Sequence, residues 1–260
     1  MKNFTKFGII FPMAATLFLS LGNCSSSTTG TEEVEETGTT GTLSSAFDAF
    51  DKTNVQVTLS GNKVIIKTNG RPNHTSPYWS NTTARSMDGI TTVAAATNHA
   101  LFINPAQEAT PSTTFAQMAP GNIDDFNGSY TLSVNASPTK ATNSSATGLG
   151  AIGISVSGAV IYNDEEGPGI ALANAVGSLD YNGAHTGPQS YHYHLEPKSW
   201  SNNDSKLIGI ISDGFFLFGR KCSSTGTYPT NLDASGGHTS TTQYSTTATY
   251  HYHTSNDLYL

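Results

Sequence analysis

The tetrapeptide Tyr-His-Tyr-His occurs twice in the chain, at residues 191–194 and again at residues 250–253. In an extended strand, the side chains of residues i and i+2 point to the same face. His192 and His194 would therefore share one face of a strand, and their two tyrosine neighbours would share the other. The alternation is typical of a β-strand, so the sequence predicts two strands that each present a pair of imidazoles.

The sequence around these tetrapeptides also repeats. Each copy is preceded by an Ile-Gly-Ile segment. In each repeat, a segment that starts with Leu-Asp and ends in Gly-x-His-Thr lies between the Ile-Gly-Ile segment and the tetrapeptide. The three landmarks recur in the same order, at offsets of 56, 53 and 59 residues: 152–154 with 208–210, 179–186 with 232–239, and 191–194 with 250–253. A long period with two copies favours a pseudo-twofold over a solenoid. We therefore expect repeat units at about 150–197 and 206–256.

Short apolar alternations continue outside the repeats. Residues 55–66 contain two such runs around Ser60-Gly61-Asn62, which is a β-hairpin signal. Residues 130–134 alternate in the same way, and residues 89–102 are the best candidate for a helix. We expect an all-β, turn-rich, β-sandwich-like fold with an internal pseudo-duplication in its C-terminal half.

The composition narrows the class of protein. Only 12% of the residues are charged, 36% are hydrophobic and 25 are glycine. These values exclude a coiled coil, a charged disordered chain and a polytopic membrane protein. The formal net charge is -7, and no basic patch is present that could neutralise phosphates. We therefore expect no nucleic-acid partner.

The N-terminus has the pattern of an export signal. Two lysines precede an apolar stretch at residues 7–21, and the segment ends in Leu21-Gly22-Asn23-Cys24. This ending resembles a bacterial lipoprotein signal, in which the cysteine is lipidated after cleavage. An ordinary secretory signal that happens to contain Cys24 is the alternative. In either case the mature chain leaves the cytoplasm.

The first 45 residues are therefore not expected to belong to the fold. We expect a signal peptide at residues 1–23 and a Ser/Thr/Glu-rich tether at residues 24–45, because the tether holds too little apolar surface to form a core. Residues 46–260 would form a single β domain. A lipid on Cys24 would anchor this domain to a membrane of the cell envelope, at the outer membrane or the cell surface.

The clustered histidines predict a metal site. His192 with His194, and His251 with His253, can each converge on one first-row metal ion, and a third imidazole from a nearby loop completes a three-histidine site. The loop candidates are His185 and His238. Three neutral imidazoles with an open position suit Zn(II) or Cu(II). With Cys24 assigned to the lipid, thiolate-rich sites are not expected. The sequence leaves open whether one shared site or two sites form.

These motifs also resemble the YHYH-domain family of secreted and surface bacterial proteins. The resemblance rests on both tetrapeptides, on the Gly-x-His-Thr segments that precede them, on Asp213-Gly214-Phe215 and on Thr68 to His74, and it covers roughly residues 55–255. It implies a fold unit with a histidine-rich centre and implies no reaction. Family members often carry a cysteine just before Gly-x-His, where this chain has Ala234 and Ser235. Cys222 is thus left without an obvious partner, and a free thiol is expected.

Four further residues are weaker candidates. His74 reads equally well as an additional ligand or as a surface histidine. Asp213 reads first as a turn former and second as a ligand or general base. Asp180 and Asp233 could each orient a loop histidine, or could cap a turn.

Three functions from different classes remain open. The first is a lipid-anchored envelope protein that binds a transition metal. The second is a metal-dependent enzyme that uses the same site, and the third is a surface interaction module with structural histidines. We rank the binding protein first, because the candidate ligands are visible in the sequence while a general base and a substrate pocket are not.

Overall fold

The computed structural model describes residues 41–74, 127–171, 179, 182–187, 190–195 and 204–254. Cys24, Asp180 and the expected helix at residues 89–102 lie outside the described residues. Within the described ranges, no helix is both long enough and apolar enough to cross a membrane.

The N-terminal part of the described chain forms a small layer. A short 3-10 helix, η1 (Ser45–Ala49), is capped by the Ser44 side chain, which accepts a hydrogen bond from the backbone N–H of Ala46. Three strands then form an antiparallel sheet in the order β1-β2-β3: β1 (Val55–Ser60), β2 (Lys63–Thr68) and β3 (Tyr130–Asn135). The expected hairpin at residues 55–66 is confirmed, since Ser60 pairs with Lys63 across its turn.

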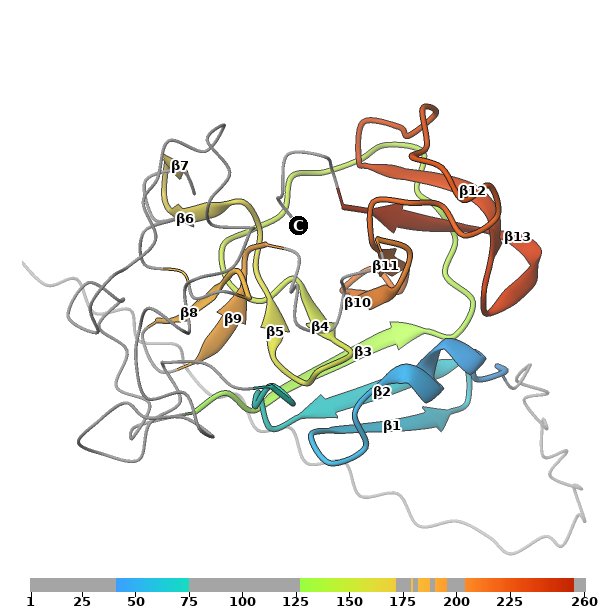
Figure 1. Cartoon of the computed structure of the whole chain (residues 1–260). Coiled ribbons are helices and arrows are strands. Elements are labelled where there is room, and N and C mark those ends of the chain that lie inside the picture. The colour runs from blue at the N-terminus through green and yellow to red at the C-terminus, as the bar shows by residue number, and fades with distance from the viewer. Residues whose placement is uncertain are drawn as a thin grey trace, which may run out of the picture. The chain divides into compact units, whose positions relative to one another are not determined.

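The C-terminal part forms an eight-stranded sheet, in the order β12-β13-β11-β10-β4-β5-β9-β8 (Figure 1). Its strands are β4 (Gly153–Ser155), β5 (Val160–Ile161), β8 (Ala184–Thr186), β9 (Tyr191–Tyr193), β10 (Leu207–Ile211), β11 (Phe216–Phe218), β12 (Gly237–Thr242) and β13 (Ser245–His253). A separate two-stranded sheet pairs β6 (Glu165–Gly167) with β7 (Ile170–Ala171).

The two halves of the large sheet have the same topology. They meet at the antiparallel pair of β4 and β10. Outward from this pair, each half continues with an antiparallel strand (β5 or β11), a parallel strand (β9 or β13) and a final antiparallel strand (β8 or β12). The registers match too, because His185 lies opposite His192 in one half and His238 lies opposite His251 in the other. An origin by duplication stays a prediction, but the halves correspond strand by strand.

The main core lies between the small layer and the middle of the large sheet. Figure 1 shows the β1-β2-β3 sheet and η1 beside the centre of the eight strands. The buried side chains come from both layers: Ala46, Phe47, Phe50, Val55, Val64, Ile66, Leu132, Val134, Ile154, Val156, Leu207, Ile210 and Phe218. Two sheets packed over a shared apolar core form the all-β, sandwich-like architecture that the sequence predicted.

The junction of the two halves depends on a matched pair of glycines. Gly153 on β4 and Gly209 on β10 occupy corresponding positions. A Cβ at Gly209 would overlap the carbonyl oxygen of Ile154, and a Cβ at Gly153 would meet the carbonyl oxygen of Ile210. Backbone oxygens of a central strand pair cannot move aside, so only glycine fits at these two positions.

We predict that Gly209→Ala destabilises the domain by about 1–3 kcal/mol, because the added methyl group overpacks the β4–β10 junction. Urea denaturation of the variant would measure the loss. Gly148→Ala is the control, since a Cβ there meets nothing within 4 Å. Equal stability of the two variants would show that the junction tolerates the extra carbon.

Candidate metal centres

The described residues contain two groups of side chains that could each hold a metal ion. The first consists of His185, His192 and His194, and all three side chains are buried. Their ring centroids lie 4.7 to 5.2 Å apart, with the rings inclined to one another by 70 to 78°. We call this group and its surroundings the Glu166 centre, because the Glu166 carboxylate lies beside the rings. Oε1 lies 3.3 Å from Nε2 of His185, and Oε2 lies 3.3 Å from Nε2 of His194.

The second group consists of Cys222, His238, His251 and His253, again all buried. We call it the Cys222 centre. The candidate donor atoms of its four side chains lie within 4.8 Å of one another. Its rings repeat the arrangement of the first group, with centroids 4.9 to 5.1 Å apart and inclinations of 66 to 73°.

Strand geometry produces both groups. In each half the histidine pair follows the alternation of a strand, β9 or β13, as the sequence predicted. The third histidine was expected on a loop, but it lies on the neighbouring strand, β8 or β12, directly opposite the first histidine of the pair. Cross-strand neighbours in an antiparallel ladder are close, which brings the third ring to the other two.

A left-handed glycine precedes the third histidine in each half. Gly183 has φ 72° and Gly236 has φ 76°, a conformation that residues with a Cβ rarely adopt. The carbonyl oxygens of these glycines accept hydrogen bonds from the backbone N–H groups of His194 and His253 respectively. The tight turn thus ties the start of β8 or β12 to the end of the histidine pair.

Hydrogen bonds set which ring nitrogen faces the centre. The Nδ1 atoms of His192 and His194 donate to the carbonyl oxygens of Ser190 and Asn163, at 3.4 and 2.6 Å. A carbonyl oxygen can only accept, so the proton lies on Nδ1 and the lone pair lies on Nε2. In the first group, the buried Nε2 of His194 has no hydrogen-bond partner, and its contact with Glu166 lacks hydrogen-bond geometry.

The same pattern holds in the Cys222 centre. Nδ1 of His251 donates to the Thr249 carbonyl at 2.9 Å, and Nδ1 of His253 donates to the Gly219 carbonyl at 2.6 Å. Nδ1 of His238 lies 3.0 Å from the Oδ1 atom of Asn231, which accepts. All three Nε2 lone pairs therefore point into the centre, where Nε2 of His238 also lies 3.4 Å from the Ser240 hydroxyl. The arrangement is unfavourable for three neutral rings and favourable around a cation.

The spacing of these nitrogens fits a tetrahedral ion. Nε2 of His253 lies 3.1 Å from Nε2 of His251 and 3.2 Å from Nε2 of His238. Zinc–nitrogen bonds of 2.0–2.1 Å in a tetrahedral shell place two nitrogens about 3.3–3.4 Å apart. Each of these two distances needs to grow by only about 0.1–0.3 Å for the nitrogens to become ligands of one ion.

Burial disfavours the charged form of five of these imidazoles, those of His192, His194, His238, His251 and His253. Burial, followed by the charge of neighbouring histidines, lowers the pKa of His192 well below its ordinary value. Burial is also the main cause that lowers the pKa of His194 and of His253, each to about 4. Burial raises the pKa of Cys222, but hydrogen bonds with Ser224 and Ser240 outweigh it, and the net shift is downward. Metals bind neutral imidazoles and deprotonated thiols, so a lowered thiol pKa favours metal binding.

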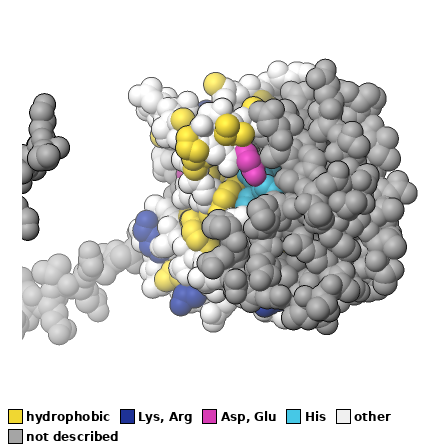
Figure 2. All heavy atoms as spheres, turned by 90° about the vertical axis from the view of Figure 1, so that its left-hand side faces the viewer, with side chains coloured by type: hydrophobic (Ala, Val, Ile, Leu, Met, Phe, Trp, Pro, Cys, Tyr) yellow, Lys and Arg dark blue, Asp and Glu magenta, His cyan; other side chains and the backbone are white. Residues whose placement is uncertain are grey.

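Cavities border both centres. A cavity of about 220 Å³ borders the Glu166 centre, lined by its three histidines together with Leu149, Gly150, Tyr162, Glu165, Glu166 and Gly187. Figure 2, which shows the side of the molecule that bears β6 to β9, has histidine side chains beside an acidic side chain in a hollow of the surface. The ring of Tyr162 stacks on His192, with centroids 3.8 Å apart, and forms one wall.

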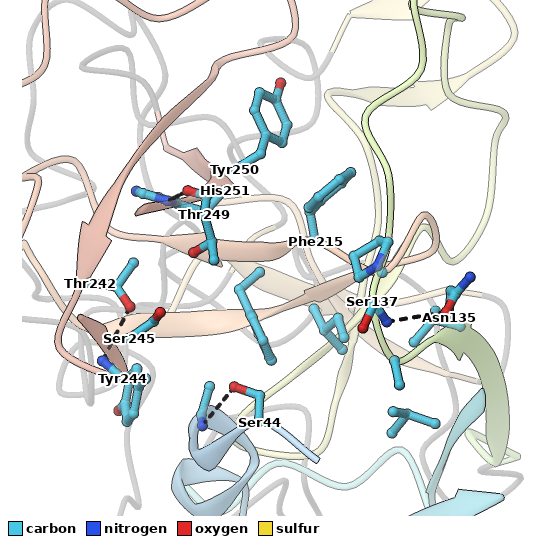
Figure 3. Close-up of a pocket in the computed structure, with 18 of the residues that line it drawn as sticks. Ser44, Asn135, Ser137, Phe215, Thr242, Tyr244, Ser245, Thr249, Tyr250 and His251 are labelled. Carbon is cyan, nitrogen blue, oxygen red and sulfur yellow. Dashed lines mark hydrogen bonds between the residues drawn. The ribbon is translucent and has the colours of Figure 1, made fainter. Parts of the chain in front are cut away.

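A larger cavity, of about 630 Å³, lies between η1 and β13 (Figure 3). Phe215, Tyr244 and Tyr250 contribute to its lining. His251 of the Cys222 centre also reaches its wall, where the hydrogen bond from Nδ1 to the Thr249 carbonyl is visible. The nitrogen used on this side is Nδ1, so Nε2 stays available to the centre.

The weaker candidates lie outside both groups of donors. The Asp213 side chain accepts hydrogen bonds from the backbone N–H of Phe215 and from the Tyr252 hydroxyl. The bond to Phe215 is that of a residue that forms a turn, as the sequence analysis expected first. Asp233 accepts hydrogen bonds from Lys140, Tyr250 and two N–H groups of its own turn, so it caps that turn and does not orient His238.

His74 also lies apart from the two groups. Its ring nitrogens pair with the Tyr193 hydroxyl and with the side-chain amide of Asn182. Because both nitrogens have partners already, the ring is fixed in the tyrosine layer on the side of β9 opposite His192.

Three residues at these centres were missed by the sequence analysis. Glu166 and Cys222 are the candidate fourth donors, and Asn231 orients His238. The sequence offered no local motif for any of them. A signal does exist in the repeat itself, because Glu166 and Cys222 are separated by the same 56 residues as the two Ile-Gly-Ile segments.

The lowered pKa values predict an acid-labile metal-free protein. Unfolded histidines take up protons near pH 6.5, whereas His194 and His253 do so in the fold only near pH 4. Between these values the unfolded state binds more protons, so the free energy of unfolding falls as the pH is lowered, by at most about 3 kcal/mol for each group. Urea titrations of chelator-treated protein from pH 7 to pH 4 would measure this slope.

The matched control replaces both side chains by glutamine, which does not ionise. The variant His194→Gln with His253→Gln should show a shallower dependence on pH over the same window. An unmodified chain whose stability stays level from pH 6.5 to pH 4 would contradict the assigned protonation states.

Comparisons with known proteins give one match. Residues 129–231 match the family model described as YHYH protein. The matched segment contains the strands from β3 to β11, and with them the Glu166 centre, and it also contains Cys222. A search of curated proteins and a search of solved structures each found no match. Over residues 129–231 the chain is therefore similar to the YHYH family.

Proposed function

We propose that the protein is a metal-binding protein of the cell envelope, with two separate centres for Zn or Cu ions. The observation that supports this most strongly is the convergence of imidazole lone pairs. In the Cys222 centre, the unprotonated Nε2 atom of His253 lies 3.1 and 3.2 Å from those of His251 and His238, and the three Nδ1 atoms have hydrogen-bond partners elsewhere.

A purely structural role for the histidines accounts poorly for this arrangement. Imidazoles that only stabilise an interior use one nitrogen to donate and the other to accept, so that every buried polar atom is paired. Here the Nε2 atoms meet one another, and that of His194 has no hydrogen-bond partner at all. A cation at each centre would satisfy these atoms.

Two separate centres are favoured over one shared centre. β8 and β9 lie at one edge of the eight-stranded sheet, and β12 and β13 lie at the other (Figure 1). The four central strands lie between them, which favours two separate ions.

We predict that replacing either histidine pair removes one ion and leaves the other. His192→Ala with His194→Ala should halve the metal bound per chain, and His251→Ala with His253→Ala should do the same. The measurement is elemental analysis of protein purified without a histidine tag and loaded with Zn(II). Circular dichroism of each variant controls for loss of the fold.

The result also separates the alternatives. If either pair of substitutions removed all metal from a folded chain, one shared centre would replace the two. If the unsubstituted chain bound no metal and gained no thermal stability from Zn(II) or Cu(II), the surface interaction module with structural histidines would be the better account.

The envelope location rests on Cys24. We propose that a lipid on this residue tethers the β domain through the Ser/Thr/Glu-rich segment that precedes η1. Expressed in a bacterium that processes lipoproteins, the chain should fractionate with membranes, and Cys24→Ser should release it into the soluble fraction. Equal partition of the two proteins would rule out the lipid anchor.

A further inference from the structure

The two centres have their fourth donor at the same topological position. Nδ1 of His194 donates to the carbonyl of Asn163, and Nδ1 of His253 donates to the carbonyl of Gly219. The two carbonyls are thus equivalent in the two halves. Three residues beyond the first lies Glu166, and three residues beyond the second lies Cys222. One half therefore presents a carboxylate where the other presents a thiol.

Glu166 is a hard donor in an open setting. It lies on β6, and its side chain is 29% exposed at the cavity that borders the three histidines. Both of its oxygens lie 3.3 Å from an Nε2 atom, so either could reach an ion held by the rings. The cavity leaves room for water beside such an ion.

Cys222 is a soft donor whose own side chain is buried. It is 1% exposed, it forms no disulfide, and Sγ lies 3.0 Å from Ser224 Oγ and 3.2 Å from Ser240 Oγ. A turn that starts at this residue, closed by a hydrogen bond from the Gly226 N–H to the Cys222 carbonyl, holds the thiol beside the rings. With the three imidazoles it completes a shell of four donors.

We propose that the two centres select different metals: the Cys222 centre retains Cu(I), and the Glu166 centre holds Zn(II) with one coordination position facing the cavity. Thiolates favour Cu(I) over harder ions, whereas imidazoles with a carboxylate suit Zn(II). With three imidazoles and Glu166 as ligands, a fifth position toward the cavity could bind exchangeable water, since zinc can expand to five ligands. This inference rests on the proposed metal-binding function and adds that the two centres bind different metals.

The experiment uses the full chain in a Cys24→Ser background, so that Cys222 is the sole thiol. Metal-free protein receives one equivalent each of Cu(I) and Zn(II) under reducing, oxygen-free conditions. X-ray absorption at the copper and zinc edges then identifies the neighbours of each metal. We expect sulfur beside copper and only nitrogen or oxygen beside zinc.

Two variants exchange the fourth donor. Cys222→Ser should weaken Cu(I) binding at least about tenfold, since even residues outside the first coordination shell change metal affinity 10- to 100-fold. Zn(II) at the other centre should be unaffected. Glu166→Cys, at a partly exposed position that tolerates substitution, should create a second centre with sulfur-bound Cu(I). Glu166→Gln is its matched control and should create none.

The outcomes separate this inference from the function beneath it. If both centres bound metal but shared copper and zinc equally, or if sulfur were found beside zinc, the division between the centres would be wrong and metal binding would stand. If neither ion bound to the folded chain, the proposed function itself would fail. Should Cys222→Ser not fold, Glu166→Cys still decides the question.

Discussion

Three imidazole lone pairs cannot stay close together in a protein interior without a positive charge among them. In the Cys222 centre the Nε2 atoms are 3.1 and 3.2 Å apart, in a region that holds the imidazoles neutral. A proton could bridge two of them, but burial opposes the charge it brings. A metal ion satisfies all three nitrogens at once, and this requirement connects the strands, the turns and the carbonyl contacts of both halves.

The backbone provides most of this arrangement. Strand alternation brings two rings to one face, and the antiparallel neighbour contributes the third. Carbonyl oxygens of Ser190, Asn163, Thr249 and Gly219 then orient four of the rings by accepting from Nδ1. Since these acceptors are backbone atoms, side-chain substitutions next to the centres can change the fourth donor without disturbing the rings. Glu166 and Cys222 illustrate this freedom.

The parts of the structure that could be predicted are those that depend on local pattern. Alternation at the two tetrapeptides predicted the strands, the recurring landmarks predicted two equivalent units, and six histidines were recognised as candidate ligands. Cys222 and Glu166 could not be found in this way, because each reaches its centre through a tertiary contact with no fixed sequence spacing to the histidines. Asn231, which orients His238, was missed for the same reason. The sequence instead favoured Asp233 for this role, but the Asp233 carboxylate accepts hydrogen bonds from Lys140 and Tyr250.

Anomalous X-ray diffraction at the zinc edge, from crystals of the full chain grown with Zn(II), tests the central claim most directly. The account predicts two peaks per chain, one among the rings of His185, His192 and His194 and one among His238, His251, His253 and the Cys222 sulfur. Peaks confined to the protein surface, with the six rings hydrogen-bonded to one another or to water, would contradict it.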